Sequence, residues 1–119
     1  MPQFLVAIHH PDNYDPGTED RAMALQIDAL NDEMVEAGIR IFVGGLHSAS
    51  TAKHILPDGD FKLADGPFVK ASEHVGGFWV LELANMAEAC AWGQKAAKAC
   101  KAPVEVRQFH GSTAQNPAI

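Results

Sequence analysis

A set of histidines and one carboxylate in a constrained turn are the residues of this sequence best suited to moving protons. Six histidines are present; His9 follows the first apolar run, His47 follows a Gly-Gly-Leu segment, and Asp65 begins an Asp-Gly-Pro-Phe run. A histidine beside a carboxylate is the simplest general acid–base pair, because the carboxylate orients the imidazole and stabilises its charged form. We therefore predict that His9 or His47 pairs with Asp65. The alternative is that Asp65 only stabilises its own turn and the histidines are solvated loop ends.

The Asp-Gly-Pro-Phe run predicts a shaped connection, since glycine and proline disfavour a helix and proline disfavours a central strand. We expect this connection to end in a buried Phe68, the first of three candidates for contacting a substrate. Trp79 is the second, because Phe78 and Trp79 are neighbours on a strand and so face opposite ways. Each is either a core residue or the aromatic lining of a pocket. The third, Arg107, either holds an anionic substrate or pairs with Glu82 across strands.

Other chemistries are not favoured by the residue spacing. The sequence has no H-E-x-x-H, no C-x-x-C and no glycine-rich strand-to-helix loop, so we predict no metal site and no cofactor. Cys90 and Cys100 lie in one predicted helix and are too far apart to form a disulfide within it. We expect both to be buried on its apolar face, which we place at Met86, Ala89, Cys90, Gly93, Ala97 and Cys100.

Composition points to one globular domain that does not bind nucleic acid. The chain has 119 residues, 47% hydrophobic residues and a net charge of −6, and its nine Lys and Arg form no cluster. Nucleic acid and anionic membrane surfaces are therefore disfavoured as partners. The apolar runs are only strand-sized, which predicts no membrane span, and no signal-type segment begins the chain. We expect a cytoplasmic protein.

Apolar periodicity predicts two helices and six strands. The first helix begins at Thr18 as N-cap and ends at Gly38, and the second begins at Asn85, capped with Glu88, and ends before Pro103. A hairpin turn is expected at residues 57–60, and His74 is placed in a loop. The strands are expected at residues 3–9, 40–47, 50–56, 61–64, 77–83 and 104–109.

This order predicts an α+β, ferredoxin-like domain, β-α-β-β-α-β with an extra β-hairpin, over residues 1–110 and followed by a mobile tail at 111–119. Two helices cover one face of the antiparallel sheet, and the chain has nothing left to cover the other. The strands nevertheless look apolar on both sides. We therefore expect a homodimer in which two sheets pack face to face about a twofold axis.

One set of motifs runs through most of the chain: Ala64-Asp65-Gly66-Pro67-Phe68, Glu73 and Gly76-Gly77-Phe78, with flanking segments at residues 4–6, 33–38, 45–46 and 104–107. In these residues the chain resembles the DGPF family of the YCII-related superfamily. The resemblance implies a ferredoxin-like fold, a dimeric α+β barrel and a cleft with a histidine and an aspartate. Lys70 and Ser72 depart from the usual family pattern, which weakens any role for a basic residue there.

We therefore predict a small dimeric enzyme that uses a His–Asp pair for proton transfer on a small organic molecule. Lyase or isomerase chemistry fits best, because no redox cofactor site and no activated nucleophile is visible. The resemblance agrees with this, since at least one branch of the superfamily resembles a lyase. The alternative is a dimeric ligand-binding or regulatory module without catalytic activity. The resemblance implies that such a module is associated with sigma-factor systems.

Overall fold

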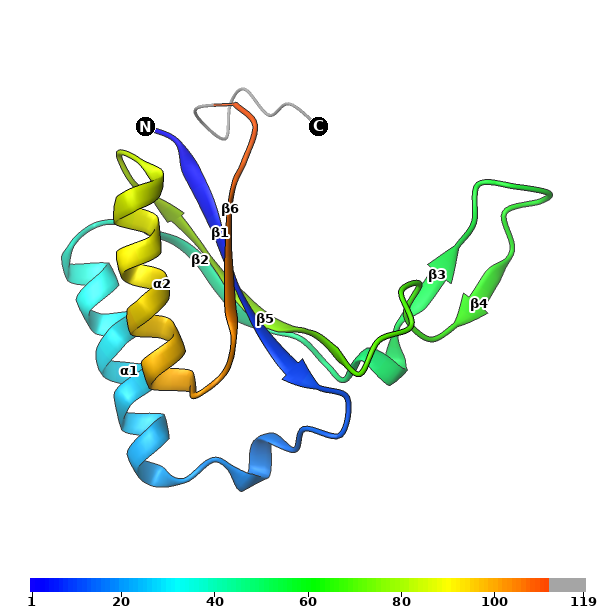
Figure 1. Ribbon diagram of the computed structural model, residues 1–119, viewed down its shortest axis with the longest axis horizontal. Helices are drawn as coiled ribbons and strands as arrows, with labels where there is room; N and C mark the ends of the chain where they lie inside the picture. Colours follow the sequence, from blue (N-terminus) through cyan, green and yellow to red (C-terminus); the bar gives the residue numbers. More distant parts are fainter. Residues whose placement is uncertain (112–119) are drawn as a thin grey trace.

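The computed structural model describes residues 1–111, which form a mixed α+β structure (Figure 1). The predicted tail at 111–119 lies outside the described residues except for Gly111. The elements are β1 Gln3–Pro11, α1 Arg21–Glu36, β2 Arg40–Gly45, β3 Lys53–Ile55, β4 Leu63–Asp65, β5 Glu73–Glu82, α2 Met86–Cys100 and β6 Val104–Gln108, with short 3-10 helices at Pro16–Thr18 and Ala49–Thr51. The predicted order of strands and helices is therefore found in the structure.

The main sheet is antiparallel and has the strand order β2-β5-β1-β6. Both helices lie on one of its faces, and they also pack against each other (Figure 1). The strands β3 and β4 form a separate hairpin that projects away from this sheet. This arrangement is compatible with the α+β, ferredoxin-like fold expected from the sequence.

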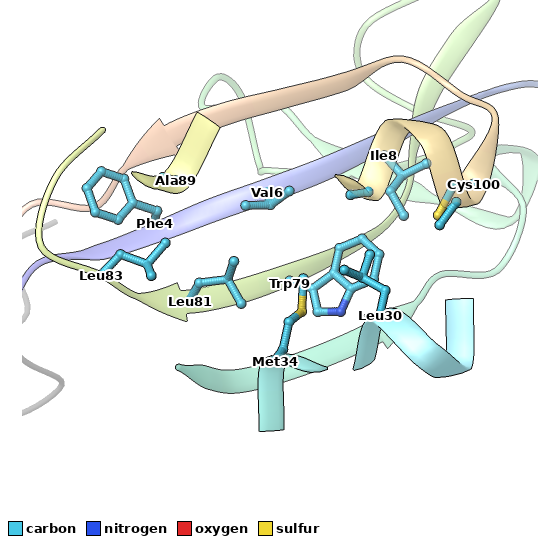
Figure 2. Close-up of a cluster of buried hydrophobic side chains, with 12 residues drawn as sticks. Phe4, Val6, Ile8, Leu30, Met34, Trp79, Leu81, Leu83, Ala89 and Cys100 are labelled. Atoms are coloured by element: carbon cyan, nitrogen blue, oxygen red, sulfur yellow. The ribbon is translucent and has the colours of Figure 1, made fainter. Parts of the chain in front are cut away.

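The hydrophobic core lies between the main sheet and the two helices (Figure 2). Alternate residues of β1 and β5 point toward the helices, so Phe4, Val6, Trp79 and Leu81 are fully buried there, together with Met34 of α1. Burial of each such side chain is worth about 1.5–3 kcal/mol relative to exposure, which makes this layer the main source of stability.

The second helix lies close to β6 because the face that it turns to the sheet is built from small residues. A Cβ atom added to Gly93 would come within 2.9 Å of Val106. The buried positions are Ala89, Gly93, Ala96, Ala99 and Cys100, which is a stripe rotated from the predicted one. Cys90 was predicted to be buried and is exposed, because the helix turns Ala96 and Ala99, rather than Cys90, toward the sheet and the other helix.

Two elements begin at other residues than predicted, because local hydrogen bonds determine where they start. Helix α1 was predicted to begin at Thr18, but its N-cap is Asp20, whose side chain accepts a hydrogen bond from the N–H of Met23 at 2.7 Å. Thr18 instead closes a 3-10 turn. The strand expected from residue 50 begins only at Lys53, because Ser48 caps a 3-10 turn over the three residues before Ala52.

Three of the predicted local signals are confirmed. The Asn85 side chain accepts from the N–H of Glu88 at 2.9 Å, and the Glu88 carboxylate accepts from the N–H of Ala84 at 3.2 Å. Gly38 ends α1 in the left-handed region, with φ +72°. The chain reverses between β3 and β4 across residues 57–60, as expected of the hairpin.

The face of the sheet opposite the helices carries apolar side chains that no described element covers. Phe42 is 52% exposed and lies 5.8 Å from the ring of Phe78, measured between centroids. Large apolar side chains are also exposed on the hairpin and in the loop that follows it: Ile55, Leu56, Phe61, Leu63, Phe68 and Val69. Within residues 1–111, no helix is long and apolar enough to pass through a membrane.

Candidate functional site

A cavity of about 330 Å³ lies at the end of the main sheet where β1 leaves the helix layer. The connection from β1 to α1 runs across this end of the molecule (Figure 1). The apolar part of the lining includes Ile8, Met23, Ile27, Val43 and Trp79. The polar part is contributed by His10, Asp12, Tyr14, Glu19, His47 and His74. A mainly apolar cavity with a few convergent polar groups is the usual form of a small-molecule site.

The pairing of β1 with β5 brings two of these histidines together. Ile8 pairs with Gly77 and the next residue of β1, His9, pairs with Val75, so Gly76 is an extra residue in β5. Such a β-bulge shifts the alternation of side chains on the bulged strand. His74 therefore lies directly opposite His10, on the same side of the ladder, in β5 rather than in the loop predicted for it.

His10 is held in a tight space that only glycine provides. A Cβ atom added to Gly76 would lie 2.3 Å from the Nδ1 atom of His10. On another side, the imidazole stacks on the Tyr14 ring, with centroids 3.8 Å apart and planes at 11°. Burial lowers the pKa of His10, and the nearby Glu19 carboxylate offsets only part of that effect. His10 is therefore neutral over a wider pH range than an ordinary histidine.

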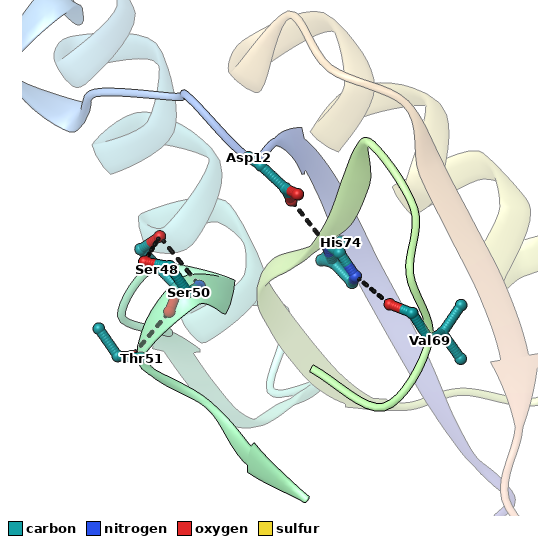
Figure 3. Close-up of polar contacts among 6 residues, drawn as sticks. All are labelled: Asp12, Ser48, Ser50, Thr51, Val69 and His74. Atoms are coloured by element: carbon teal, nitrogen blue, oxygen red, sulfur yellow. Dashed lines mark hydrogen bonds and ion pairs between the residues drawn. The ribbon is translucent and has the colours of Figure 1, made fainter. Parts of the chain in front are cut away.

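The surroundings of His74 favour its protonated, positively charged form. Its Nδ1–H donates to Asp12 Oδ1 at 2.6 Å, and its Nε2–H donates to the backbone carbonyl of Val69 at 2.8 Å (Figure 3). Carboxylate and carbonyl oxygens only accept, so both ring nitrogens must carry a proton to make both bonds. The bonds to Val69 and to Asp12 thus raise the pKa of His74.

Two further groups at the cavity are held protonated. The Tyr14 hydroxyl donates to the Glu19 carboxylate, and burial together with this bond raises the pKa of Tyr14. Burial also raises the pKa of the Cys100 thiol to about 11. A thiol in that state is a poor nucleophile, so the chemistry available at the cavity is that of imidazole and carboxylate groups.

Two of the residues predicted from the sequence line the cavity and four lie outside its lining. His47 lies at the cavity, exposed, and Trp79 lies beside it with its indole N–H donating to Asn31 Oδ1 at 2.9 Å. Trp79 is 1% exposed, so it packs under the helices, one of the two outcomes expected for it. His9, Asp65, Phe68 and Arg107 do not contribute to the lining.

Asp65 lies at the end of β4, in the projecting hairpin. Its nearest charged partner is Lys53, with which it is paired across the two strands, and its side chain is 88% exposed. An exposed pair of this kind contributes about 0–1 kcal/mol. The next residue, Gly66, has φ +91°, and its N–H donates to the Ala52 carbonyl at 2.7 Å. The turn therefore ties the hairpin to the residue before β3.

The other residues outside the lining lie on two separate surfaces. Phe68 was predicted to be buried, but it is 67% exposed and meets the ring of His54 edge-on at 6.1 Å. The reason is that the turn at Gly66 lies on the projecting hairpin, away from the core. Arg107 pairs with Leu5 on β1 and shares the open face of the sheet with Glu105, as alternation predicts. The chemical roles predicted for these residues, and for His9 and Asp65, stay predictions.

Five residues of the site were not among the site residues predicted from the sequence: His10, Asp12, Tyr14, Glu19 and His74. Four of them lie at the end of β1 or in the segment that follows it, where histidine, aspartate and tyrosine occur within a few positions. That concentration at a strand end is a signal that sequence reasoning can use. The bond between Asp12 and His74 spans 62 positions and gives no local signal.

Among residues 1–111, no group of three or more histidine, cysteine or acidic side chains is arranged to hold a metal ion. In comparisons with known proteins, the model of the YCII-related domain matches residues 1–110 of the chain. No curated protein matches it.

Replacing Gly76 tests the close contact that positions His10. In Gly76→Ala the new Cβ atom displaces the imidazole toward solvent, so the pKa of His10 rises toward the ordinary value of about 6.5. We expect a loss of about 1–3 kcal/mol in the free energy of unfolding from the added bulk. NMR titration of the histidine ring protons measures the first effect and urea denaturation the second.

Gly45→Ala is the matched control, because its Cβ atom would meet nothing closer than 3.9 Å. An unchanged His10 titration in Gly76→Ala would show that the imidazole is not held against this glycine.

The titration of His74 should depend on Asp12. In the unchanged protein its pKa lies above about 6.5, and in Asp12→Asn it falls toward that value because one acceptor has lost its charge. Since the folded-state pKa is the raised one, the stabilisation by His74 is fully present below about pH 6.5 and is lost as the pH rises through the folded pKa. NMR titration and unfolding at several pH values measure both effects.

Asp65→Asn is the control for the loss of a carboxylate, because Asp65 pairs with Lys53 rather than with a histidine. A His74 that titrates identically in the unchanged protein and in Asp12→Asn would contradict the assignment of this pair.

Proposed function

This chain belongs to the YCII-related family, and we propose that it is an acid–base enzyme of the lyase or isomerase type, acting on a small organic molecule bound in the cavity. The observation that carries the proposal is the pair of cross-strand neighbours His10 and His74, whose pKa values are shifted in opposite directions. Two neighbouring titratable groups whose pKa values are shifted in opposite directions are suited to serve as base and acid in one reaction.

His10 is the base in this proposal and His74 is the acid. The neutral imidazole of His10 takes a proton from a carbon atom of the substrate. In an elimination, the electron pair of that C–H bond becomes the new double bond, and the leaving group departs with its own bonding pair and a proton from His74. In an isomerisation, the double bond shifts and a proton is returned to a different carbon. To donate, His74 exchanges one of its two acceptors, Asp12 or the Val69 carbonyl, for the substrate.

We keep the hypothesis of a His–Asp pair but assign it to different residues. The Asp12–His74 pair takes the place of a pair between Asp65 and either His9 or His47, because its members share the cavity and are hydrogen-bonded at 2.6 Å. His47 is proposed to contact the substrate from the exposed side. The proposed reaction uses no cofactor, and the cytoplasmic location stays a prediction.

The acid–base role is tested by substituting His10. A collection of small organic molecules is screened for turnover with the unchanged protein, and pH profiles are then recorded for any substrate found. We expect His10→Gln to lower kcat about 10²–10⁴-fold, which is the usual contribution of a general base, and to abolish the acidic limb of the profile.

His110→Gln is the control, because His110 is exposed and lies outside the cavity lining. Unchanged turnover in His10→Gln would overturn the proposal. A molecule that binds in the cavity and is never turned over would favour the alternative, a non-catalytic module that binds a ligand or regulates in a sigma-factor system.

We also propose that two copies of the chain pair through the open face of the main sheet, which would form a dimeric α+β barrel. The support is the exposure of Ile41 and Phe42 on β2, each 52% exposed, beside Phe78 on the same sheet. A two-layer domain does not leave such a face in water without cost, and a twofold axis lets the same surface cover itself.

Sedimentation at micromolar concentration should therefore give twice the chain mass of 12.8 kDa. Phe42→Glu should give the mass of a single chain, because each copy would bury an unpaired carboxylate in the interface. Leu25→Glu is the matched control, since Leu25 is exposed on the outer side of α1. A single-chain mass for the unchanged protein would contradict the dimer.

A further inference from the structure

We propose that the ligand of the cavity is a small organic cation, a protonated amine carried on a compact apolar body. The inference rests on the proposed function only in taking the same cavity as the place where the substrate binds. It concerns the charge and shape of that molecule, which the acid–base proposal leaves open.

Carboxylates outnumber cations in the lining of the cavity. Asp12 and Glu19 each bring a carboxylate to its lining, whereas none of the Lys and Arg side chains of the described residues contributes to it. An anionic molecule such as a phosphate or carboxylate would meet two like charges and no cation but His74. A positively charged molecule would be attracted, and most strongly where the walls exclude water.

Three other titratable groups of the lining add no charge that would reverse this balance. Burial lowers the pKa of His10, so its imidazole carries no charge at neutral pH. The raised pKa values keep the Tyr14 phenol and the Cys100 thiol neutral as well. His74 is the cation that its bonds favour, and it already neutralises Asp12, its partner at 2.6 Å. The Glu19 carboxylate has no cationic partner among the described residues.

Both carboxylates keep an oxygen free for a ligand. The Tyr14 hydroxyl is bonded to Oε2 of Glu19 and the His74 ring to Oδ1 of Asp12. In the hydrogen bonds of residues 1–111, Oε1 of Glu19 and Oδ2 of Asp12 are left without a donor. An ammonium group has three N–H donors and no acceptor, which suits a carboxylate oxygen that still lacks a donor.

The rest of the cavity sets the shape of the ligand. Met23 and Ile27 of α1 and Val43 of β2 contribute apolar side chains to the lining of the same cavity. A volume of about 330 Å³ is at the lower end of the range for small-molecule sites, about 300–1,000 Å³. One ring or a short branched chain beside the ammonium group fits that space, and a nucleotide does not.

The inference is tested with three molecules of similar shape and different charge: benzylamine, benzyl alcohol and benzoate. Their dissociation constants are measured by NMR titration of the full chain at pH 7.5 and low ionic strength, with the ring signals of His10 and His74 as reporters of binding in the cavity. We expect benzylamine to bind about tenfold tighter than benzyl alcohol, which corresponds to about 1.4 kcal/mol. Benzoate should bind most weakly, and added salt should reduce the preference for the amine.

Glu19→Gln should remove most of the preference for benzylamine and leave the binding of benzyl alcohol unchanged. Glu36→Gln is the control, since Glu36 is exposed at the end of α1 and lies outside the cavity lining. The inference is overturned if benzoate binds as tightly as benzylamine, if Glu19→Gln leaves the preference intact, or if none of the three molecules shifts the His10 and His74 signals.

These outcomes are separate from those of the acid–base proposal. Binding of benzyl alcohol in the cavity with no preference for the amine would overturn the cation inference and leave the enzyme hypothesis standing. Conversely, a clear preference for the amine together with full turnover in His10→Gln would support the cation site and refute the role of His10 as base.

Discussion

One extra residue in the pairing of β1 with β5 underlies the whole candidate site. Because Gly76 has no partner in β1, the residues beyond it change sides, and His74 faces the cavity instead of the open side of the sheet. The same residue leaves room for His10, since the imidazole occupies the space where a Cβ atom would lie. The bulge thus turns the side chain of His74 toward the cavity, and its glycine leaves space for the side chain of His10.

The two histidines then differ because of what surrounds each of them. His10 is half-buried against Tyr14 and is favoured in its neutral form, whereas His74 lies between two hydrogen-bond acceptors and is favoured as a cation. Identical side chains therefore acquire opposite tendencies within one cross-strand pair. That difference is what makes proton transfer the chemistry best supported at this cavity, and the neighbouring carboxylates extend the same reasoning to the charge of the ligand.

The turn at residues 65–68 serves the hairpin more directly than the cavity. Gly66 adopts a backbone conformation with positive φ, and its carbonyl lies 2.9 Å from Nδ1 of His54 across the hairpin. A two-stranded hairpin is only marginally stable alone in water, and this one exposes several large apolar side chains. The hairpin and the open face of the main sheet together leave much apolar surface for a partner, which is the basis for proposing a dimer.

The sequence by itself determined the elements and their order, because the signals for them are local. Alternation along β1 and β5, the Asn85–Glu88 cap and the left-handed Gly38 each depend on residues a few positions apart. It also identified Trp79 and His47, which border the cavity. The start of α1 was predicted wrongly, because Thr18 was taken as the cap and the side chain of Asp20 makes the capping bond instead. Only the tertiary structure decided which groups meet: the bond between Asp12 and His74, the contact of His10 with Gly76, and the placement of Asp65 beside Lys53. These depend on strand register, a bulge and burial, which arise from contacts between segments far apart in the chain and have no periodic trace in the sequence.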